Sequence, residues 1–438
     1  MNKLLNTKKW NLIITGAILV LAILVTILTG ITFRTFSKYE TYFYLAENVE
    51  IQKLVEYSPN LKGTTGAETN IYIIKGPDAV NKDIKDCPSI LILGGTHPNE
   101  PSGQLTAAIF LENLKVSGDT VVFILTETNR SAFTHSHPQE ASPLYYTLTT
   151  KTGAKRIFKF GSRATNTNEQ WPNPDIYTHS SGQQLSNSET RNINRAYPGN
   201  INGSYTERVA YGVTQLIKEN DIKVTIDLHE ASPEYITINA MVYHQNAENL
   251  AGLAELEIKF QDISINSNPS PKDLHGLTHR ELGDFTNTLV ILCETSNAAQ
   301  GKIRGAFTEE LITYSEKDKF YEKAREITEA RKKAGEGTPL LYGYPTSINE
   351  RVARHTATIL AISQAYNYGA TDPTYSYIFD KLGTERKQAL IDMGAIDIDL
   401  DLDSMLTIED EIEHGYKSQY ELLMDLGVGY FLHDPEQN

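Results

Sequence analysis

Almost wholly apolar runs alternate with helical segments through the middle of this chain. The runs 89–94 and 120–125 have the composition of strands that are buried on both faces of a parallel sheet. Further strands are predicted at 70–75, 223–228, 236–242 and 288–293, and helices at 102–114 and 206–219. Because strands alternate with helices, the sequence predicts an α/β fold with a mainly parallel or mixed sheet sandwiched by helices.

The N-terminal region contains 22 consecutive uncharged residues, Leu12–Phe33. At 1.5 Å per residue, a helix of this length is about 33 Å long, enough to cross the hydrocarbon core of a bilayer. This length, and the poor cleavage site at residues 29–31, favour one uncleaved transmembrane helix over a cleaved signal peptide. The amino terminus and three lysines precede the span and two basic residues follow it, which favours a cytoplasmic N-terminus and an extracytoplasmic position for the remainder.

These patterns divide the chain into a tail, a membrane anchor, a lead-in segment, a core and a C-terminal part. The predicted bounds are 1–11, 12–33, 34–84, 85–304 and 305–438, in that order. The core carries an insert at 130–190 that lacks periodicity, and a loop that long is usually functional or an insertion. The C-terminal part is mostly helical, with stretches at 309–333 and 350–366, and contains an acidic tail at 392–414.

The charge of the chain argues against a nucleic-acid partner, and its cysteine content excludes cysteine-based scaffolds. The net charge is −15, and the first 38 residues contain five basic and no acidic residues, so the remainder is strongly acidic and repels nucleic acid. With only Cys87 and Cys293, the chain has neither a disulfide framework nor a zinc site built mainly from thiolates. We expect two buried free thiols rather than a bridge between them.

Imidazole and carboxylate groups follow three of the predicted strands. His97 and Glu100 follow the run 89–94, His229 follows 223–228, and Glu294 follows 288–293. In open α/β sheets, ligands bind at the carboxyl ends of the strands, so these side chains are expected at one edge. A catalytic zinc takes three protein ligands, and His97, Glu100 and His229 are the candidates. Asp227, two residues before His229, shares its face and could orient its imidazole.

Two readings of these residues stay open at this point. In the first, the histidines and Glu100 bind a metal together. In the second, His97 and His229 are ordinary loop histidines, and Glu100 is an acid favoured at a helix N-terminus by the helix dipole. The occurrence of all these groups at strand ends favours the first.

Four segments together resemble the signatures of the succinylglutamate desuccinylase/aspartoacylase family, within the zinc carboxypeptidase clan. They are GGTHPNEPSG, NINRAYPG, TIDLHEA and ILCET, and the resemblance covers about residues 85–300. It implies a zinc carboxypeptidase-like fold with one Zn²⁺ bound by His97, Glu100 and His229. It also implies that Glu294 is the general base and acid, and that the pair Asn194-Arg195 holds the substrate's carboxylate.

The chain departs from this family pattern in the segment before Asn194. Family members carry an upstream arginine that stabilises the oxyanion of the tetrahedral intermediate, and here that segment is greatly expanded. The candidates are Arg130, Arg163 and Arg191, of which Arg163 is slightly preferred. His275 and His279 have the i, i+4 spacing of a metal pair, but a gating or structural role is favoured because three ligands already fill the site.

The sequence therefore predicts a membrane-anchored, extracytoplasmic, zinc-dependent hydrolase that cleaves an amide bond next to a substrate carboxylate. The four signatures favour a deacylase acting on a small N-acyl amino acid. The long insert and outward location favour the alternative, a zinc carboxypeptidase or amidase acting on peptides or cell-wall stems. A catalytically inactive binding module is the third reading, and the intact set of chemical groups argues against it.

Overall fold

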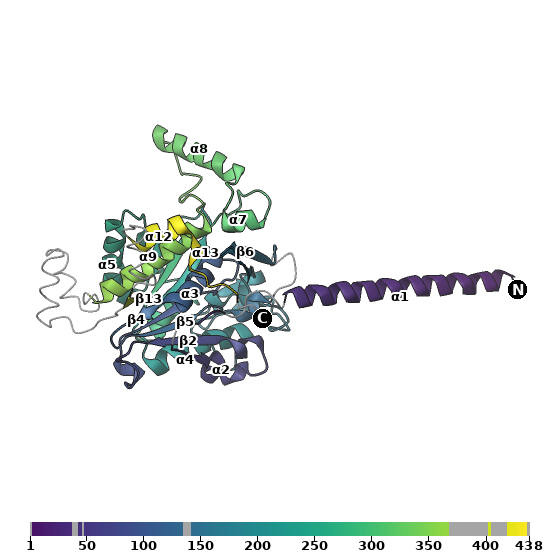
Figure 1. The fold of residues 1–438 in the computed structure, drawn as a ribbon, viewed down its shortest axis with the longest axis horizontal. Coiled ribbons are helices and arrows are strands. Elements are labelled where there is room, and N and C mark those ends of the chain that lie inside the picture. Colours follow the sequence, from purple (N-terminus) through teal and green to yellow (C-terminus); the bar gives the residue numbers. More distant parts are fainter. Residues whose placement is uncertain are drawn as a thin grey trace, which may run out of the picture.

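The computed structural model describes residues 2–36, 43–45, 48–134, 142–367, 402–403 and 418–435. Its centre is an eight-stranded mixed sheet in the order β1-β2-β5-β3-β10-β13-β11-β12 (Figure 1). The strands are β1 (Val49–Lys53), β2 (Asn70–Lys75), β3 (Ser89–Leu93), β5 (Val121–Leu125), β10 (Val224–Ala231), β11 (Ala240–Tyr243), β12 (Asn266–Pro269) and β13 (Leu289–Ser296). The central four, from β5 to β13, run parallel, whereas β2 and β11 join them antiparallel. The predicted fold class is confirmed.

Helices cover both faces of the sheet (Figure 1). One face packs against α3 (Pro101–Asn113), α5 (Glu248–Phe260) and α9 (Ile348–Asn367), and the other against α2 (Leu54–Tyr57) and α4 (Tyr205–Asn220). Alternate residues of β3 serve the two cores, Ile90 and Ile92 in the first, Leu91 and Leu93 in the second. Because both faces are buried, the run is apolar at every position, as the sequence indicates.

Shorter elements complete the described part of the chain. The remaining strands are β4 (Lys115–Val116), β6 (Tyr145–Thr149), β7 (Lys155–Lys159), β8 (Ile176–Thr178), β9 (Gln184–Ser186) and β14 (Leu402–Asp403). The remaining helices are α6 (Gly283–Phe285), α7 (Glu309–Thr313), α8 (Lys319–Ala334), α12 (Gln419–Leu426) and α13 (Val428–Phe431). Single turns near the site are η5 (Asn187–Arg191), η6 (Ile193–Arg195) and η8 (Thr278–Leu282). Most of the acidic segment 392–414 lies outside the described residues.

The strands predicted at 223–228 and 288–293 extend, as β10 and β13, to Ala231 and Ser296, so His229 and Glu294 lie within strands rather than after them. Two other predicted elements differ from the structure because of positive backbone φ angles. The helical stretch 309–333 is two helices, α7 and α8, because Tyr314 ends α7 with φ +49° and Asp318 caps the start of α8. The strand predicted at 236–242 begins only at Ala240, because Asn239 has φ +47°. Side-chain periodicity does not report such local breaks, since they depend on single dihedral angles.

The insert contains two β-hairpins that the sequence does not predict. Strands β6 and β7 pair antiparallel, as do β8 and β9. Tyr146 and Phe158 stack with ring centroids 5.7 Å apart and are buried in the core beside α3. The first hairpin is therefore attached to the sheet domain by aromatic packing, although its short strands lack a clear alternation.

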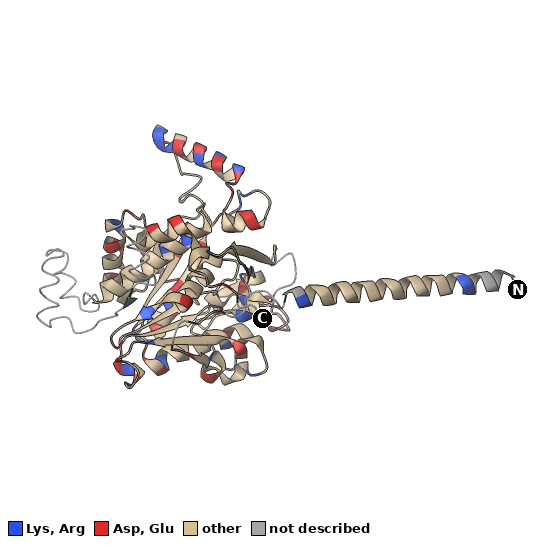
Figure 2. Ribbon diagram, in the orientation of Figure 1, with Lys and Arg blue, Asp and Glu red and all other residues tan. Residues whose placement is uncertain are grey.

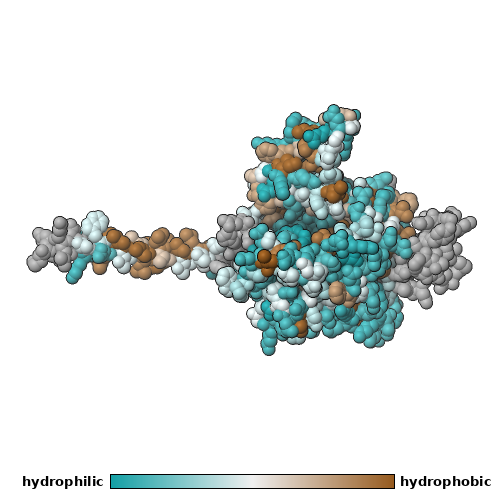
Figure 3. All heavy atoms as spheres, turned by 180° about the vertical axis from the view of Figure 1, so that it is seen from behind, coloured by the Kyte–Doolittle hydropathy of each residue, from teal (hydrophilic) through white to brown (hydrophobic). Residues whose placement is uncertain are grey.

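The helix α1 (Asn2–Phe36) is continuous and extends away from the body (Figure 1). Among its coloured residues, charged ones lie only near the two ends (Figure 2), and the apolar residues between them are exposed (Figure 3). The segment Thr7–Thr32 is long and apolar enough to span a membrane, and none of it is buried against the protein. The predicted single helix over residues 12–33 is thus confirmed.

Both cysteines are buried and free, as expected. Two buried ion pairs join distant parts of the chain. Arg156 of β7 pairs with Glu112 of α3 at 2.8 Å, and Arg351 of α9 pairs with Glu230 of β10. Glu112 also accepts a hydrogen bond from the backbone N–H of His433, so the end of the described chain is fixed to the same point.

We predict that Arg156→Met lowers the free energy of unfolding by about 3–5 kcal/mol, because it leaves the Glu112 carboxylate buried without its cation. Burial already raises the pKa of Glu112 despite Arg156, so protonation relieves part of this penalty. The stability deficit, measured by urea unfolding, should therefore grow as the pH rises from about 5 to about 8. The exposed pair Lys323–Glu326 provides the control, since Glu326→Gln should change stability little. Equal effects of the two substitutions would contradict the prediction.

Candidate functional site

The turn between β3 and α3 brings His97 and Glu100 to the sheet edge. Gly95 has φ +67°, and a side chain there would meet the Thr126 carbonyl oxygen and the Phe133 ring. A side chain at Gly103 would lie 2.5 Å from the carbonyl oxygen of Leu228, so α3 packs directly on β10 beside His229. The glycines of the first motif thus permit the close approach that joins the two histidine-bearing segments.

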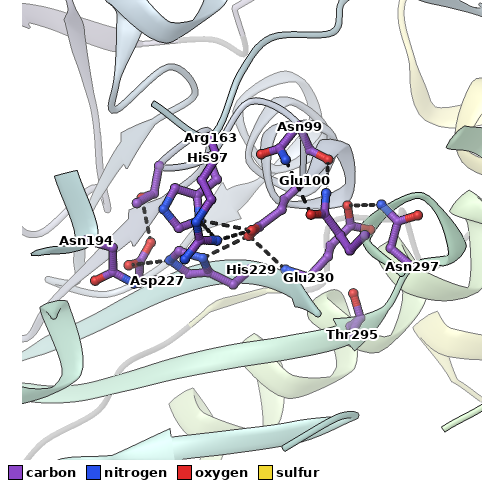
Figure 4. A network of polar contacts seen from close by, with 12 residues as sticks. His97, Asn99, Glu100, Arg163, Asn194, Asp227, His229, Glu230, Thr295 and Asn297 are labelled. Atoms are coloured by element: carbon purple, nitrogen blue, oxygen red, sulfur yellow. Dashed lines mark hydrogen bonds and ion pairs between the residues drawn. The ribbon is translucent and has the colours of Figure 1, made fainter. Parts of the chain in front are cut away.

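His97, Glu100 and His229 form one buried group (Figure 4). One oxygen of Glu100 lies 2.9 Å from Nδ1 of His97, and the other lies 2.9 Å from Nδ1 of His229. The candidate ligand atoms of all three residues lie within 4.8 Å of one another. The predicted convergence of these side chains is therefore present, and the group could hold a metal ion.

Each imidazole of this group is held from behind through its other nitrogen. Nε2 of His229 lies 2.8 Å from Asp227, which also accepts hydrogen bonds from the hydroxyls of Thr96 and Thr278 at 2.7 Å each. Nε2 of His97 lies 2.7 Å from Oδ1 of Asn192. These contacts direct both Nδ1 atoms towards Glu100, the arrangement that outer partners of metal-binding histidines produce.

The charges of this group depend on one another. Burial opposes ionisation of Glu100, but His97 and His229 outweigh it and lower the pKa of the carboxyl well below its usual range. Burial also opposes protonation of His229, and there Asp227 and Glu100 raise the pKa well above its usual value. For His97, burial and the nearby charge of Arg163 lower the pKa. The site therefore holds an ionised Glu100 carboxylate between two imidazoles whose pKa values are shifted in opposite directions, down for His97 and up for His229.

Glu294 lies on β13 directly opposite His229 of β10 in the parallel register. Its Oε2 is buried and makes no hydrogen bond within the described part of the chain. Burial raises the pKa of Glu294 to about 8, against the influence of His229. A carboxylate poised near neutral pH and without a partner is suited to accepting and donating a proton.

The structure separates the arginines that sequence reasoning left open. Arg163 lines the same cavity as the histidines, and its Nη1 lies 3.3 Å from both Glu100 and His97. Arg191 is buried, donates to the Thr165 carbonyl oxygen, and is not among the described residues that line the cavity. Arg130 pairs with Glu127 at 2.9 Å and also lies outside that lining. Of these three arginines, only Arg163 is among the described residues that line the cavity and could contact a molecule bound there.

Asn194 and Arg195 of η6 line the cavity as well, which has a volume of about 410 Å³. Oδ1 of Asn194 accepts a hydrogen bond from the backbone N–H of Thr278 at 2.8 Å, which leaves its amide nitrogen as the donor. The lining also includes apolar side chains, among them Val242, Leu277 and Leu292. The predicted site residues thus share one cavity, except Asp227, which lies behind His229, and Arg191.

Sequence reasoning missed two residues of the site, Glu189 and Asn192. Glu189 bridges Arg163 and Arg195, and Asn192 holds His97. Asn192 belongs to the NINRAYPG segment, so its position beside the Asn-Arg pair was the available signal. Glu189 carried no signal, because an acidic residue in an aperiodic insert is common and its partners are distant in sequence.

The histidines 275 and 279 do not form a pair. His279 lies in η8, lines the cavity and bonds to Ser270 at 2.8 Å, and burial lowers its pKa to about 3. His275 precedes η8, pairs with Glu281 at 2.8 Å and approaches His179 within a second group of candidate ligands. Both ring nitrogens of His179 already bond to Ser181 and to the Tyr197 carbonyl oxygen, so we assign no metal to that group.

No protein-family model matches this chain, and no curated protein sequence matches it either. Solved structures that it is similar to include a succinylglutamate desuccinylase from Silicibacter sp., 13% identical with a TM-score of 0.33 over 56% of each chain. The product-bound ectoine utilization protein EutE (DoeB) from Ruegeria pomeroyi is 14% identical, with a TM-score of 0.33, over 56% of this chain and 57% of that one.

The tripeptide-bound cell shape determinant Csd4 from Helicobacter pylori is 11% identical, with a TM-score of 0.39, over 67% of this chain and 55% of that one. Members of the family that the four motifs resemble are therefore among the structures similar to this chain. The match spans little more than half of each of these proteins. At such identities and TM-scores, activity has to be argued from the site itself.

We predict that Glu294 makes the stability of the metal-free protein depend on pH. Its pKa is raised from 4.5 to about 8 in the folded protein, so its contribution to stability is present below about 4.5 and is lost as the pH rises towards about 8. The melting temperature of the metal-free wild type should therefore fall relative to that of Glu294→Gln across this window and level off above it. Parallel melting profiles of the two proteins would contradict the assigned pKa.

Proposed function

We propose that this protein is a zinc-dependent hydrolase that cleaves an amide bond next to a substrate carboxylate. The observation that carries the proposal is the convergence of three kinds of group on one cavity. The histidines and Glu100 offer a metal site, Glu294 offers an unpartnered carboxylate, and Arg163 and Arg195 offer cations. Metal-assisted amide hydrolysis uses these three functions together.

The residues fit a single Zn²⁺ ion, held by His97, Glu100 and His229. Two imidazoles and one carboxylate are a common catalytic zinc set, and the contacts from Asn192 and Asp227 leave Nδ1 of each histidine for the metal. When bound, the ion would lower the pKa of a water molecule and polarise the scissile carbonyl group. Cys87 and Cys293 lie in the two cores rather than at this site, so they are not competing ligands.

Glu294 acts as the general base and then as the general acid. Its carboxylate takes a proton from the attacking water and passes it to the leaving nitrogen, which requires a pKa near neutrality. Without metal, the pKa of Glu294 is about 8. A cation nearby would lower this pKa, so that Glu294 would be the ionised base that the first step needs.

Arg163 and Arg195 have separate roles. Arg163 lies beside the metal-binding group, where its guanidinium can stabilise the oxyanion that forms from the carbonyl. Arg195 and the amide nitrogen of Asn194 bind the substrate carboxylate, to which the guanidinium offers a charged hydrogen-bond donor. Asp227 orients His229 without touching the substrate.

The substrate is a small N-acyl amino acid, so the enzyme is a deacylase of the succinylglutamate desuccinylase/aspartoacylase type. The cavity of about 410 Å³ is of a size for such a molecule. A carboxypeptidase or amidase that acts on peptides or cell-wall stems is the second candidate. It is favoured by the long insert, which contributes Arg163 to the cavity and carries the exposed Trp171.

We also propose that the helix α1 anchors the enzyme in a membrane, with residues 1–11 in the cytoplasm and the catalytic core 85–304 outside it. The exposed apolar side chains of the segment Thr7–Thr32 support the anchor, because an apolar helix is unfavourable in water. The C-terminal part 305–438 would complete the core through α9.

Partition of the full chain with membranes after an alkaline wash, and protease protection of each end, test the anchor and its orientation.

The proposed function predicts metal-dependent amidase activity that requires Glu294. The full chain in detergent should bind one zinc per molecule and hydrolyse members of a panel of N-acyl amino acids and short peptides. Glu294→Gln should retain zinc and lower kcat by about 10²–10⁴-fold, because the general base is removed. A zinc-loaded Glu294→Gln protein with near wild-type turnover, or a wild type that binds no metal, would overturn the proposal.

Substitutions of Arg163 and Arg191 test which of these two arginines stabilises the oxyanion. Arg163→Met should lower kcat by about 10²–10³-fold with zinc content unchanged, because it removes a donor to the developing charge. Arg191→Met should instead lower the melting temperature, because the substitution removes the buried hydrogen bond that Arg191 donates to the Thr165 carbonyl oxygen. A larger loss of kcat in Arg191→Met, at equal folded fraction, would reverse the assignment.

A further inference from the structure

Glu189 lies between the two guanidiniums of the site. Its Oε1 is 3.1 Å from Nε of Arg163, and its Oε2 is 3.3 Å from Nε of Arg195. The contact with Arg163 is a hydrogen bond and the contact with Arg195 is an ion pair, and the side chain of Asn192 donates a further hydrogen bond to Oε2 at 2.9 Å. One carboxylate on the turn η5 thus connects both arginines, and through Asn192 it is also linked to His97.

The two arginines would repel each other without this carboxylate. Burial and the charge of Arg163 lower the pKa of Arg195. Burial disfavours the ionised form of Glu189, yet Arg163 and Arg195 outweigh it and lower its pKa. Glu189 is therefore ionised at neutral pH and offsets the repulsion between two like charges in one cavity.

The contacts of Glu189 also decide which nitrogens face a ligand. It accepts a hydrogen bond from Nε of Arg163 and forms an ion pair with Nε of Arg195, so it lies on the Nε side of both guanidiniums. Nη1 of Arg163 reaches the metal-binding group, and Nη1 of Arg195 donates to the Asn194 carbonyl oxygen at 2.6 Å. Both side chains are thereby fixed in orientation and in their distance from each other.

We propose that Glu189 is a positioning residue that sets the spacing between the oxyanion donor and the carboxylate-binding donor, and so selects the substrate class. This inference rests on the proposed function. Two donors at a fixed separation fit a substrate whose scissile carbonyl and carboxylate are a fixed number of bonds apart. Because the proposed substrate carries its carboxylate next to the scissile amide, the enzyme should prefer N-acyl-α-amino acids over N-acyl-β-amino acids, in which one more methylene separates the two groups.

A purely structural role for Glu189 predicts a different result. If Glu189 only stabilised the turn η5, its substitution would lower stability and reduce activity on every substrate by the same factor. The ratio of activities on α- and β-substrates is therefore the decisive quantity, because a change in folded fraction cancels from it.

The test compares Glu189→Gln with wild type in the full, zinc-loaded chain in detergent. The probes are N-acetyl derivatives of an α-amino acid and of its β-homologue, together with the α-compound capped as a C-terminal amide. Wild type should prefer the α-compound over the β-compound by about tenfold or more. Glu189→Gln should lower this preference towards unity and lose activity mainly on the free carboxylate rather than on the capped compound.

Glu350→Gln is the matched control, because it breaks a similar, partly exposed pair with Arg354 on α9, away from the cavity. It should leave the α-to-β ratio unchanged. Glu189→Asp, which keeps the charge, should recover part of the preference. An unchanged ratio in Glu189→Gln, or an equal loss on capped and free substrates, would overturn the proposal.

Binding measurements separate this inference from the proposed function. If the wild type binds the α-compound without hydrolysing it, the proposed function fails, and the preference is measured from the two dissociation constants by calorimetry. Glu189→Gln should then lower the ratio of those constants in the same way. If the wild type neither binds nor hydrolyses the α-compound, the role assigned to Glu189 is wrong.

Discussion

The carboxylate of Glu100 between two buried imidazoles is the interaction around which the site is organised. A buried ionised group is stable only when each of its oxygens is satisfied, and here His97 takes one oxygen, while His229 and the backbone N–H of Glu230 take the other. The surrounding contacts follow from this requirement. Asp227 and Asn192 hold the imidazoles, and Thr96 and Thr278 hold Asp227.

The helix α9 supports this group from the opposite side of β10. Arg351 pairs with Glu230, the residue next to His229, and also donates to the Ile312 carbonyl oxygen. One turn further along α9, His355 lies 3.4 Å from Thr295, the residue after Glu294. The ends of β10 and β13 are thus both fixed by a helix that lies more than fifty residues further along the chain. Residues beyond 305 therefore contribute to the shape of the site as well as to the core.

The insert provides the charged groups that complete the cavity. Arg163 and Glu189 come from the insert, between the hairpin β6–β7 and the turn η6, and the neutral Asn192 lies just beyond it. Its strands are short and its loops long, but aromatic packing of Tyr146 and Phe158 and the pair Arg156–Glu112 attach it to α3. A segment without periodicity can therefore still be rigid where the site needs it, because tertiary contacts rather than local pattern hold it.

The sequence by itself determined the helices and strands that have a regular apolar pattern, and the polar side chains that lie at the carboxyl ends of the central strands. Apolar runs predicted β3 and β5 to within a residue or two, because strands buried on both faces must be apolar at every position. The placement of His97, Glu100, His229 and Glu294 at one edge followed from strand polarity alone. The position of Arg163 in the cavity lining, from which Arg191 is absent, and the contacts of Glu189 and Asn192 were decided only by the tertiary structure. Those contacts join side chains whose separation in sequence has no period, so only the folded chain determines which charges meet.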